Sequence, residues 1–263
     1  MSKTILITGA ASGFGKIVAF DLAKKGHKVI ATAQIYPQMS DLIREAKEQG
    51  IELTVDKLDV TNKTDIEYIA KKYDIDILIS NAGIAEAGQI AEQPIDLIRS
   101  MFEVNVFGAL ALAQAFIKKF IDEKRQGKIV FTTSMGELWT VPYAASYCAS
   151  KHAMGAIAEG LKTELASFNI KIATCNPGVF GTGFNDRGVD TMSRWYNPET
   201  NFTPMSDLGG AAEALAHQLD PKSMADCIVE VVLDDNPNFR NVHPKETEDF
   251  VKQLQADAWT AKS

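Results

Sequence analysis

The chain has 263 residues, of which 46% are hydrophobic, enough for one large α/β domain or two small ones. Its formal net charge is −7 at pH 7 and no basic run occurs, so a nucleic-acid partner is not expected. The amino terminus does not resemble a signal peptide, and no apolar stretch approaches the roughly 20 residues of a membrane helix, so no membrane partner is expected either.

Cysteine and histidine usage points to a reducing compartment without a metal. The three cysteines, Cys148, Cys175 and Cys227, are scattered and odd in number, which favours free thiols in the cytoplasm over a disulfide framework. The four histidines show no metal-ligand spacing, so no metal site is predicted.

Apolar strand patterns alternate with helical patterns along most of the chain. The first strand, over 3–8, is followed by a glycine turn and a helix over 15–25, and Thr61 or Asn62 is expected to cap a helix over 63–73. The other predicted strands cover 28–33, 52–58, 75–80, 128–133, 171–175 and 238–242. The other predicted helices cover 38–48, 99–124, 146–168, 208–218, 223–233 and 244–258. Pro94 is expected to open the helical region that breaks and resumes as the helix over 99–124. This order indicates an α/β fold with one doubly wound parallel sheet of about seven strands and helices on both faces. Without a linker or repeat, a single domain over 1–263 is the economical interpretation.

The regular pattern fails between about 180 and 208. Glycines and prolines alternate there with aromatic residues, among them Phe184, Trp195, Tyr196 and Phe202. The segment follows the sixth strand, and open α/β sheets bind ligands beyond the carboxyl ends of their strands. We therefore expect a substrate loop at about 180–222.

The first turn has the glycine spacing of a dinucleotide site. Gly9, Ser12, Gly13, Phe14 and Gly15 lie between a strand and a helix, where glycines let the backbone approach a diphosphate and the helix N-terminus offers free N–H groups.

Tyr147 and Lys151 are the most informative pair. Their i, i+4 spacing places both side chains on one face of the predicted helix. A cation about 4.5 Å from a phenol, at an effective dielectric of about 20, favours the phenolate by roughly 3–4 kcal/mol. The pKa of Tyr147 is therefore expected to fall by roughly 2–3 units, into the range of a general acid or base.

Together these motifs resemble the short-chain dehydrogenase/reductase family, and further matches cover most of the chain. Thr8 precedes the glycine turn, and the other matching motifs are Leu58-Asp59-Val60, Asn81-Ala82-Gly83, Asn105, Ser134 and Pro177-Gly178 with Thr182 beyond. The resemblance implies a Rossmann-like fold and an NAD(P)-dependent oxidoreductase acting on a small carbonyl or alcohol.

The resemblance also implies roles. Tyr147 would exchange a proton with the substrate oxygen, Lys151 would lower its pKa and bind the nicotinamide ribose, Ser134 would polarise the carbonyl, and Asn105 would anchor a water. The implied cofactor-binding residues are Gly9, Ser12, Gly13, Phe14, Gly15, Gln34, Asp59, Val60, Asn81, Ala82, Gly83, Tyr147, Lys151, Pro177, Gly178, Val179 and Thr182.

The cofactor type and the substrate are less constrained. The end of the second strand carries Gln34 and no acid, which favours NADP(H) over NAD(H), although no arginine is placed to pair with a 2′-phosphate. The pocket is predicted to be apolar and aromatic, which favours a hydrophobic carbonyl compound. Its expected lining comprises Gly136, Glu137, Leu138, Trp139, Val141 and Tyr143 on one side, and 178–180, Phe184 and Trp195 on the other.

Two alternatives stay open. One is an epimerase or dehydratase relative, although such relatives usually run longer. The other is an inactive dinucleotide-binding regulator, although such proteins usually lose the serine, tyrosine or lysine that is present here. The family resemblance further implies a homodimer or homotetramer, with the helices over 99–124 and 146–168 forming the contact.

Overall fold

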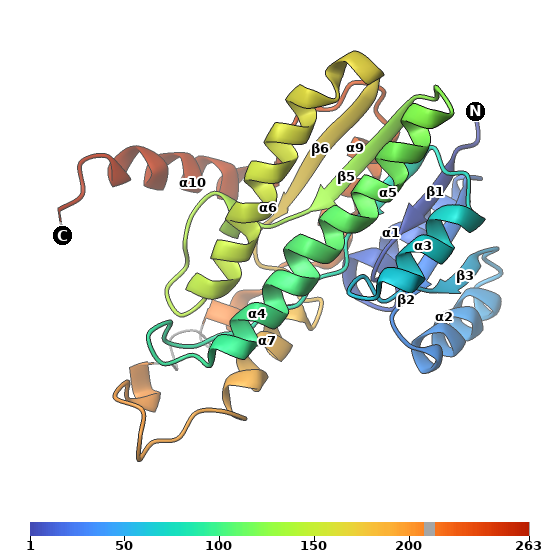
Figure 1. Ribbon diagram of the computed structural model, residues 1–263. Helices are drawn as coiled ribbons and strands as arrows, with labels where there is room; N and C mark the ends of the chain where they lie inside the picture. Colours follow the sequence, from blue (N-terminus) through green and yellow to red (C-terminus); the bar gives the residue numbers. More distant parts are fainter. Residues whose placement is uncertain (208–213, 263) are drawn as a thin grey trace.

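The computed structural model describes residues 1–207 and 214–262 (Figure 1). Seven parallel strands form one sheet in the order β3-β2-β1-β4-β5-β6-β7, which confirms the predicted doubly wound α/β fold. The strands are β1 (Thr4–Ile7), β2 (Lys28–Ala33), β3 (Thr54–Lys57), β4 (Ile77–Ser80), β5 (Gly127–Thr132), β6 (Ile170–Pro177) and β7 (Arg240–His243).

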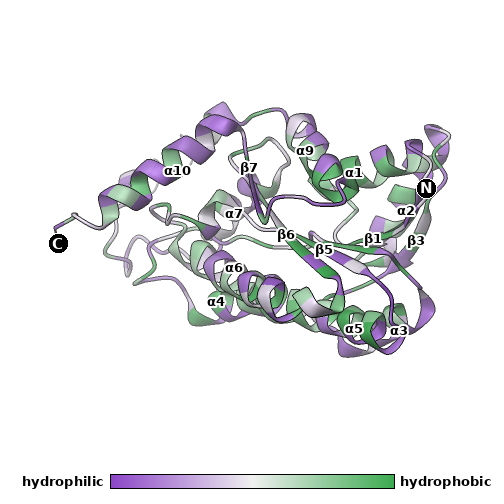
Figure 2. Cartoon of the chain, turned by 90° about the horizontal axis from the view of Figure 1, so that it is seen from above, coloured by the Kyte–Doolittle hydropathy of each residue, from purple (hydrophilic) through white to green (hydrophobic). Residues whose placement is uncertain are grey.

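Helices cover both faces of the sheet (Figure 2). Helices α1 (Gly13–Lys24), α2 (Tyr36–Glu48) and α9 (Pro221–Leu233) pack on one face, and α3 (Lys63–Lys72), α5 (Ala109–Asp122) and α6 (Ala145–Glu164) pack on the other. Successive strand residues point to opposite faces, so Ile5 and Ile7 enter one hydrophobic core while Leu6 enters the other. This is why the strands read as nearly continuous apolar runs.

The helical region expected to open at Pro94 has its irregular part later than predicted, within 99–124. It runs through α4 (Ile95–Phe102), a π-helical segment (Glu103–Gly108) and α5. By length and composition alone, Ile95–Asp122 could cross a membrane, which corrects the statement that no stretch approaches this length. Half of its most apolar stretch is buried inside the protein, against the sheet and α6, and the core helices of soluble proteins can have the same length and composition.

Two segments differ from the sequence prediction. Helix α7 (Phe184–Met192) lies where no regular structure was predicted, because it begins after Gly183, which has a φ of +73°, and contains Gly188. Gly188 is buried, and a Cβ there would approach the Ala85 Cβ to 3.2 Å. Close packing therefore favours glycine at this position, and glycine is a poor helix former, so the sequence pattern did not indicate a helix. The helix predicted over 208–218 falls partly on 208–213, outside the described residues, and Ala214–His217 forms a 3₁₀ turn.

Two other helices, α3 and α10 (Lys245–Ala258), form where the sequence predicted them. Asn62 caps α3, where its Oδ1 accepts hydrogen bonds from the N–H groups of Thr64 and Asp65. Helix α10 follows β7 and projects from the body of the molecule (Figure 1).

Candidate active site

A cavity of about 540 Å³ opens at the carboxyl ends of the strands. Its lining contains Ser134, Tyr147 and Lys151 together with almost all of the residues predicted to bind a dinucleotide, Gly15 excepted. The predicted lining residues are Gly9, Ser12, Gly13, Phe14, Gln34, Asp59, Val60, Asn81, Ala82, Gly83, Pro177, Gly178, Val179 and Thr182. Motifs far apart in the sequence therefore meet in one space.

The three glycines of the turn from β1 into α1 lie where a side chain would be strained or obstructed. Gly9 and Gly13 have φ values of +66° and +54°, and a Cβ on Gly15 would lie 2.4 Å from the carbonyl oxygen of Gly9. Ser12 precedes α1 without a side-chain cap hydrogen bond, which leaves the first N–H groups of the helix available. Gly15 thus lets the turn close without lining the cavity, and the arrangement fits a diphosphate.

The neighbouring strand ends are tied together around Thr8. Its hydroxyl accepts hydrogen bonds from the N–H groups of Asn81 and Ala82, and the Asn81 side chain donates to the Thr8 carbonyl. These bonds fix the ends of β1 and β4 against each other, which holds the floor of the cavity.

At the end of β2, Gln34 donates a 3.0 Å hydrogen bond to the Asp59 carboxylate. Burial raises the pKa of Asp59, but hydrogen bonds from Gln34 and Thr61 outweigh this and leave the pKa below its usual value. An ionised carboxylate therefore lies beside Gln34, although no acid directly follows β2 in the sequence.

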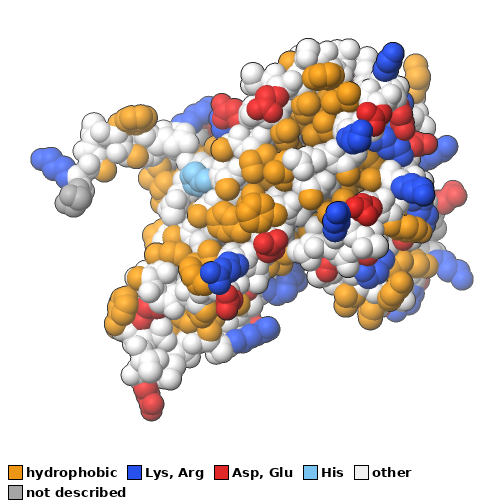
Figure 3. Space-filling model, viewed as in Figure 1, with side chains coloured by type: hydrophobic (Ala, Val, Ile, Leu, Met, Phe, Trp, Pro, Cys, Tyr) orange, Lys and Arg blue, Asp and Glu red, His pale blue; other side chains and the backbone are white. Residues whose placement is uncertain are grey.

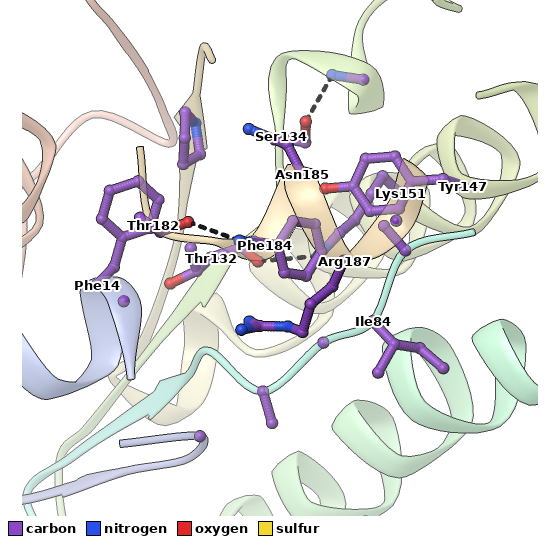
Figure 4. Close-up of a pocket in the computed structure, with 18 of the residues that line it drawn as sticks. Phe14, Ile84, Thr132, Ser134, Tyr147, Lys151, Thr182, Phe184, Asn185 and Arg187 are labelled. Atoms are coloured by element: carbon purple, nitrogen blue, oxygen red, sulfur yellow. Dashed lines mark hydrogen bonds between the residues drawn. The ribbon is translucent and has the colours of Figure 1, made fainter. Parts of the chain in front are cut away.

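Tyr147 and Lys151 lie near the amino-terminal end of α6 and face the end of β5 (Figure 4). The Lys151 ammonium lies 5.7 Å from the centre of the Tyr147 ring and donates a hydrogen bond to the Thr132 carbonyl at 3.2 Å. Ser134 begins a 3₁₀ turn (Met135–Glu137), and its hydroxyl accepts a hydrogen bond from the N–H of Gly136 at 3.0 Å.

The pKa of Tyr147 is raised in the protein alone, which corrects the predicted depression by Lys151. Burial is the dominant cause, and a hydrogen bond with Ser134 lowers the pKa only in part. Burial also lowers the pKa of Lys151 to about 8, against a raising influence from Glu137. Desolvation of both groups outweighs the attraction assumed from their spacing, and the tyrosine is a neutral donor at pH 7.

Asn105 does not line the cavity but supports it from behind. Its Oδ1 accepts from the N–H of Ile84, and its Nδ2 donates to the Ile84 carbonyl and the Ser150 hydroxyl. A Cβ on Gly83 would lie 3.1 Å from the Asn105 Oδ1 and 3.6 Å from the Lys151 Nζ, so both groups flank the same glycine. The π-helical segment turns the Asn105 side chain toward this point.

Glu137, predicted to contact substrate, does not line the cavity in this structure. The side chain is 2% exposed, and its carboxylate accepts hydrogen bonds from Asn176 at 2.7 Å and Arg240 at 3.3 Å. Asn176 also donates to the Thr133 hydroxyl and the Ser134 carbonyl. Glu137 therefore braces the strand end that carries Ser134 and does not face the cavity.

Three further residues predicted for the substrate pocket lie elsewhere. Leu138 and Trp139 contact α10: the Leu138 carbonyl accepts from Gln255, and the Trp139 ring packs edge-on against Phe250. Trp195 packs against Gly88, where a Cβ would approach its ring to 2.4 Å. Tyr143 and Phe184 do line the cavity, as predicted, with Gly136 and Val141.

Several lining residues were not predicted. They are Gln38, Ile84, Ala85, Glu86, Ala87, Thr132, Asn185, Arg187, Gly188 and Val189, among others. Residues 84–87 directly follow the Asn81-Ala82-Gly83 motif, and their position in the sequence could have indicated them. Arg187 and its neighbours were missed because helix α7 was missed.

Comparison with known proteins agrees with this geometry. Residues 3–192 match the profile described as short chain dehydrogenase. The protein belongs to the short-chain dehydrogenase/reductase family. The 3-ketodihydrosphingosine reductase of Bacteroides thetaiotaomicron is 30% identical over 243 residues, which cover 90% of this chain and 86% of the relative. Among enzymes of other names, L-xylulose reductase of Caenorhabditis elegans is 34% identical over 75% of this chain and 77% of the relative.

A solved member of the family has the same fold. The short-chain dehydrogenase/reductase of Burkholderia phymatum in complex with NAD has a TM-score of 0.85 at 22% identity and covers 100% of this chain and 96% of its own. Family membership and the named relatives make the protein an NAD(P)-dependent oxidoreductase.

Proposed function

We propose that the protein is a carbonyl reductase or alcohol dehydrogenase that acts on a hydrophobic ketone or secondary alcohol. One observation carries this proposal: Ser134, Tyr147 and Lys151 line the same cavity as the glycine turn of α1. Two hydroxyl groups and a cation are thereby placed beside the space that fits a dinucleotide.

The residues present fit a nicotinamide cofactor. The glycine turn accepts the diphosphate, Asp59 and Asn81 line the adenosine side, and Thr182 lines the opposite side, against Gly13. Thr132 lines the cavity, and its buried hydroxyl has no hydrogen-bond partner among the described residues. When bound, the cofactor supplies or accepts the hydride.

The chain's own residues handle the substrate oxygen and its proton. The hydroxyls of Ser134 and Tyr147 donate hydrogen bonds to the substrate oxygen and stabilise negative charge that develops on it. Because burial keeps Tyr147 protonated, it is prepared to give its proton during carbonyl reduction. Below its pKa of about 8, Lys151 is cationic and compensates the charge left on Tyr147.

The substrate end of the cavity supports an apolar substrate. Ile84, Val141, Phe184 and Val189 line it, and the Phe184 ring lies 5.8 Å from the Tyr147 ring. Similarity to a relative named for reducing 3-ketodihydrosphingosine also supports a hydrophobic carbonyl compound.

We propose NADP(H) as the preferred cofactor. No carboxylate directly follows β2, and Gln34 and Gln38 line the cavity with amide groups that can donate to a 2′-phosphate. The Asp59 carboxylate beside Gln34 opposes this preference by repulsion. Fluorescence titration with NADPH and NADH measures the balance, and tighter binding of NADH would overturn the preference.

We also propose a homodimer or homotetramer in the cytoplasm. Figure 3 shows hydrophobic side chains on the face where α5 and α6 lie, and Phe107, at the start of this stretch, is 55% exposed. The free cysteines suit a reducing compartment. Light scattering after size exclusion tests the oligomer, and a monomer at micromolar concentration would refute it.

Turnover assays test the proposed reaction. The protein is mixed with NADPH or NADH and a panel of aliphatic, aromatic and polar ketones, and oxidation of the cofactor is followed by absorbance. We expect turnover with bulky apolar ketones in preference to sugars. Cofactor binding without turnover of any ketone, or of any secondary alcohol in the reverse direction, would instead favour an inactive dinucleotide-binding regulator.

A further inference from the structure

Arg187 is a cavity-lining cation that the proposed chemistry does not use. It lies in α7, one turn after Gly183, and its guanidinium folds back over the start of its own helix. A Cβ on Gly183 would lie 3.5 Å from the Arg187 Nη1. Figure 4 shows the guanidinium pointing away from Tyr147, toward the side of the cavity where Phe14 lies in the first turn of α1.

Arg187 differs from every other arginine of the chain. The sequence contains six arginines, and five of them form ion pairs with carboxylates within 4.0 Å. Within residues 1–207 and 214–262, Arg187 forms no such pair. Its charge is therefore left to a ligand or to solvent.

The segment that carries Arg187 touches the glycine turn. Thr182 lies directly before Gly183, and a Cβ on Gly13 would lie 3.2 Å from the Thr182 Cβ. The start of α7 and the start of α1 are thus packed together, with the guanidinium beside them. The N-terminus of α1 provides N–H groups and a partial positive charge for a diphosphate but no full cation.

Lys151, the other cationic residue in the cavity lining, does not lie beside the glycine turn. Lys151 is 5% exposed, bonds the Thr132 carbonyl and lies at the Tyr147 end of the cavity. The acids Asp59 and Glu86 also line the cavity, so a doubly charged diphosphate needs a compensating cation.

We propose that Arg187 binds the diphosphate of the nicotinamide dinucleotide and fastens α7 over it, an assignment that rests on the proposed cofactor binding. A guanidinium suits this role because its planar set of donors matches two phosphate oxygens at once. The cofactor is then held between two helices, by backbone N–H groups of α1 and by a side chain of α7.

Equilibrium binding of cofactor fragments tests this assignment without catalysis. Affinities for NADPH, NADH, ADP-ribose and adenosine are measured by calorimetry for the wild type, Arg187→Gln and Arg187→Lys. We expect Arg187→Gln to weaken binding of the three diphosphate compounds by about 10- to 100-fold, because charge-assisted hydrogen bonds are lost. Adenosine should bind equally to all three proteins, and Arg187→Lys should show an intermediate loss.

Arg194→Gln is the matched control. Arg194 follows α7, pairs with Asp190 at 3.1 Å and has a side chain that is 72% exposed outside the cavity, so its loss should leave ADP-ribose binding unchanged. Wild-type affinity of Arg187→Gln for ADP-ribose would refute the assignment while leaving the proposed function intact, as would a change confined to the KM of anionic substrates. Failure of the wild type to bind any dinucleotide would refute the proposed function and, with it, this inference.

Discussion

Replacing Lys151 with methionine should stabilise the fold while abolishing activity. Burial lowers the pKa of Lys151 from 10.5 to about 8, so the folded protein holds this ammonium at a cost. Each unit of pKa difference between the folded and unfolded states corresponds to about 1.36 kcal/mol, so the cost is about 3 kcal/mol at pH 7. Losing the hydrogen bond to the Thr132 carbonyl costs about 1 kcal/mol, so the free energy of unfolding should rise by a net of about 2 kcal/mol.

The gain should depend on pH with a defined sign. Between pH 8 and 10.5 the unfolded wild type binds more protons at this lysine than the folded wild type, so its stability rises with pH. The advantage of Lys151→Met is therefore full below pH 8 and disappears by about pH 10.5. Urea unfolding of both proteins from pH 7 to pH 10.5 measures the difference in their free energies of unfolding. Other titrating groups contribute equally to both proteins and therefore cancel in this difference.

Lys118→Met is the control, because that side chain is 76% exposed in α5 and pairs with Asp122. Its effect should stay within about 0.5 kcal/mol at each pH. If Lys151→Met is no more stable than the wild type at pH 7, or if its advantage does not shrink with pH, then Lys151 is not held as a destabilised cation.

Three other substitutions probe the site and its scaffold. Tyr147→Phe should keep cofactor affinity but lower turnover by roughly 10³-fold, since the proton donor is lost; near-normal turnover would exclude the proposed mechanism. Gly15→Ala should destabilise the protein by about 3 kcal/mol and abolish cofactor binding, because the added Cβ would lie 2.4 Å from the Gly9 carbonyl oxygen. The control Gly160→Ala, in α6, should stabilise the protein by up to about 1 kcal/mol. Similar melting temperatures for the two variants would contradict this expectation. Asn62→Ala should cost about 1 kcal/mol in thermal unfolding and leave turnover unchanged, and an unchanged stability would mean that the cap contributes nothing.

The sequence predicted the sheet and most residues at the glycine-turn end of the cavity, for a physical reason. Strand residues such as Ile5, Leu6 and Ile7 are buried on both faces, so their hydrophobicity directly reports the strand. The glycine turn is recognisable because its geometry excludes side chains, which restricts the sequence to glycine at Gly9 and Gly15. Constraints of this kind act on residues close together in the sequence, so a local pattern reveals them.

The substrate end was predicted less well because it depends on contacts between distant segments. Glu137 faces Asn176 and Arg240, and Trp139 faces Phe250, and none of these pairings has a local signal. The pKa of Tyr147 failed as a prediction for the same reason. Helical spacing gives the distance between Tyr147 and Lys151, but desolvation by the surrounding fold decides the sign of the pKa change.

Three features of the cavity share one explanation. Lys151 is a buried cation, the Thr132 hydroxyl is buried without a partner among the described residues, and Arg187 has no carboxylate in that part of the chain. The buried ammonium and the unpaired hydroxyl are each a cost in a cavity without a ligand, whereas the exposed Arg187 guanidinium is hydrated. The three residues line one space that begins at the glycine turn, where a dinucleotide with a doubly charged diphosphate would lie beside all of them. Cofactor binding should therefore raise the melting temperature of the wild type more than that of Arg187→Gln at equal cofactor concentration, because only the wild type holds the diphosphate from both helices.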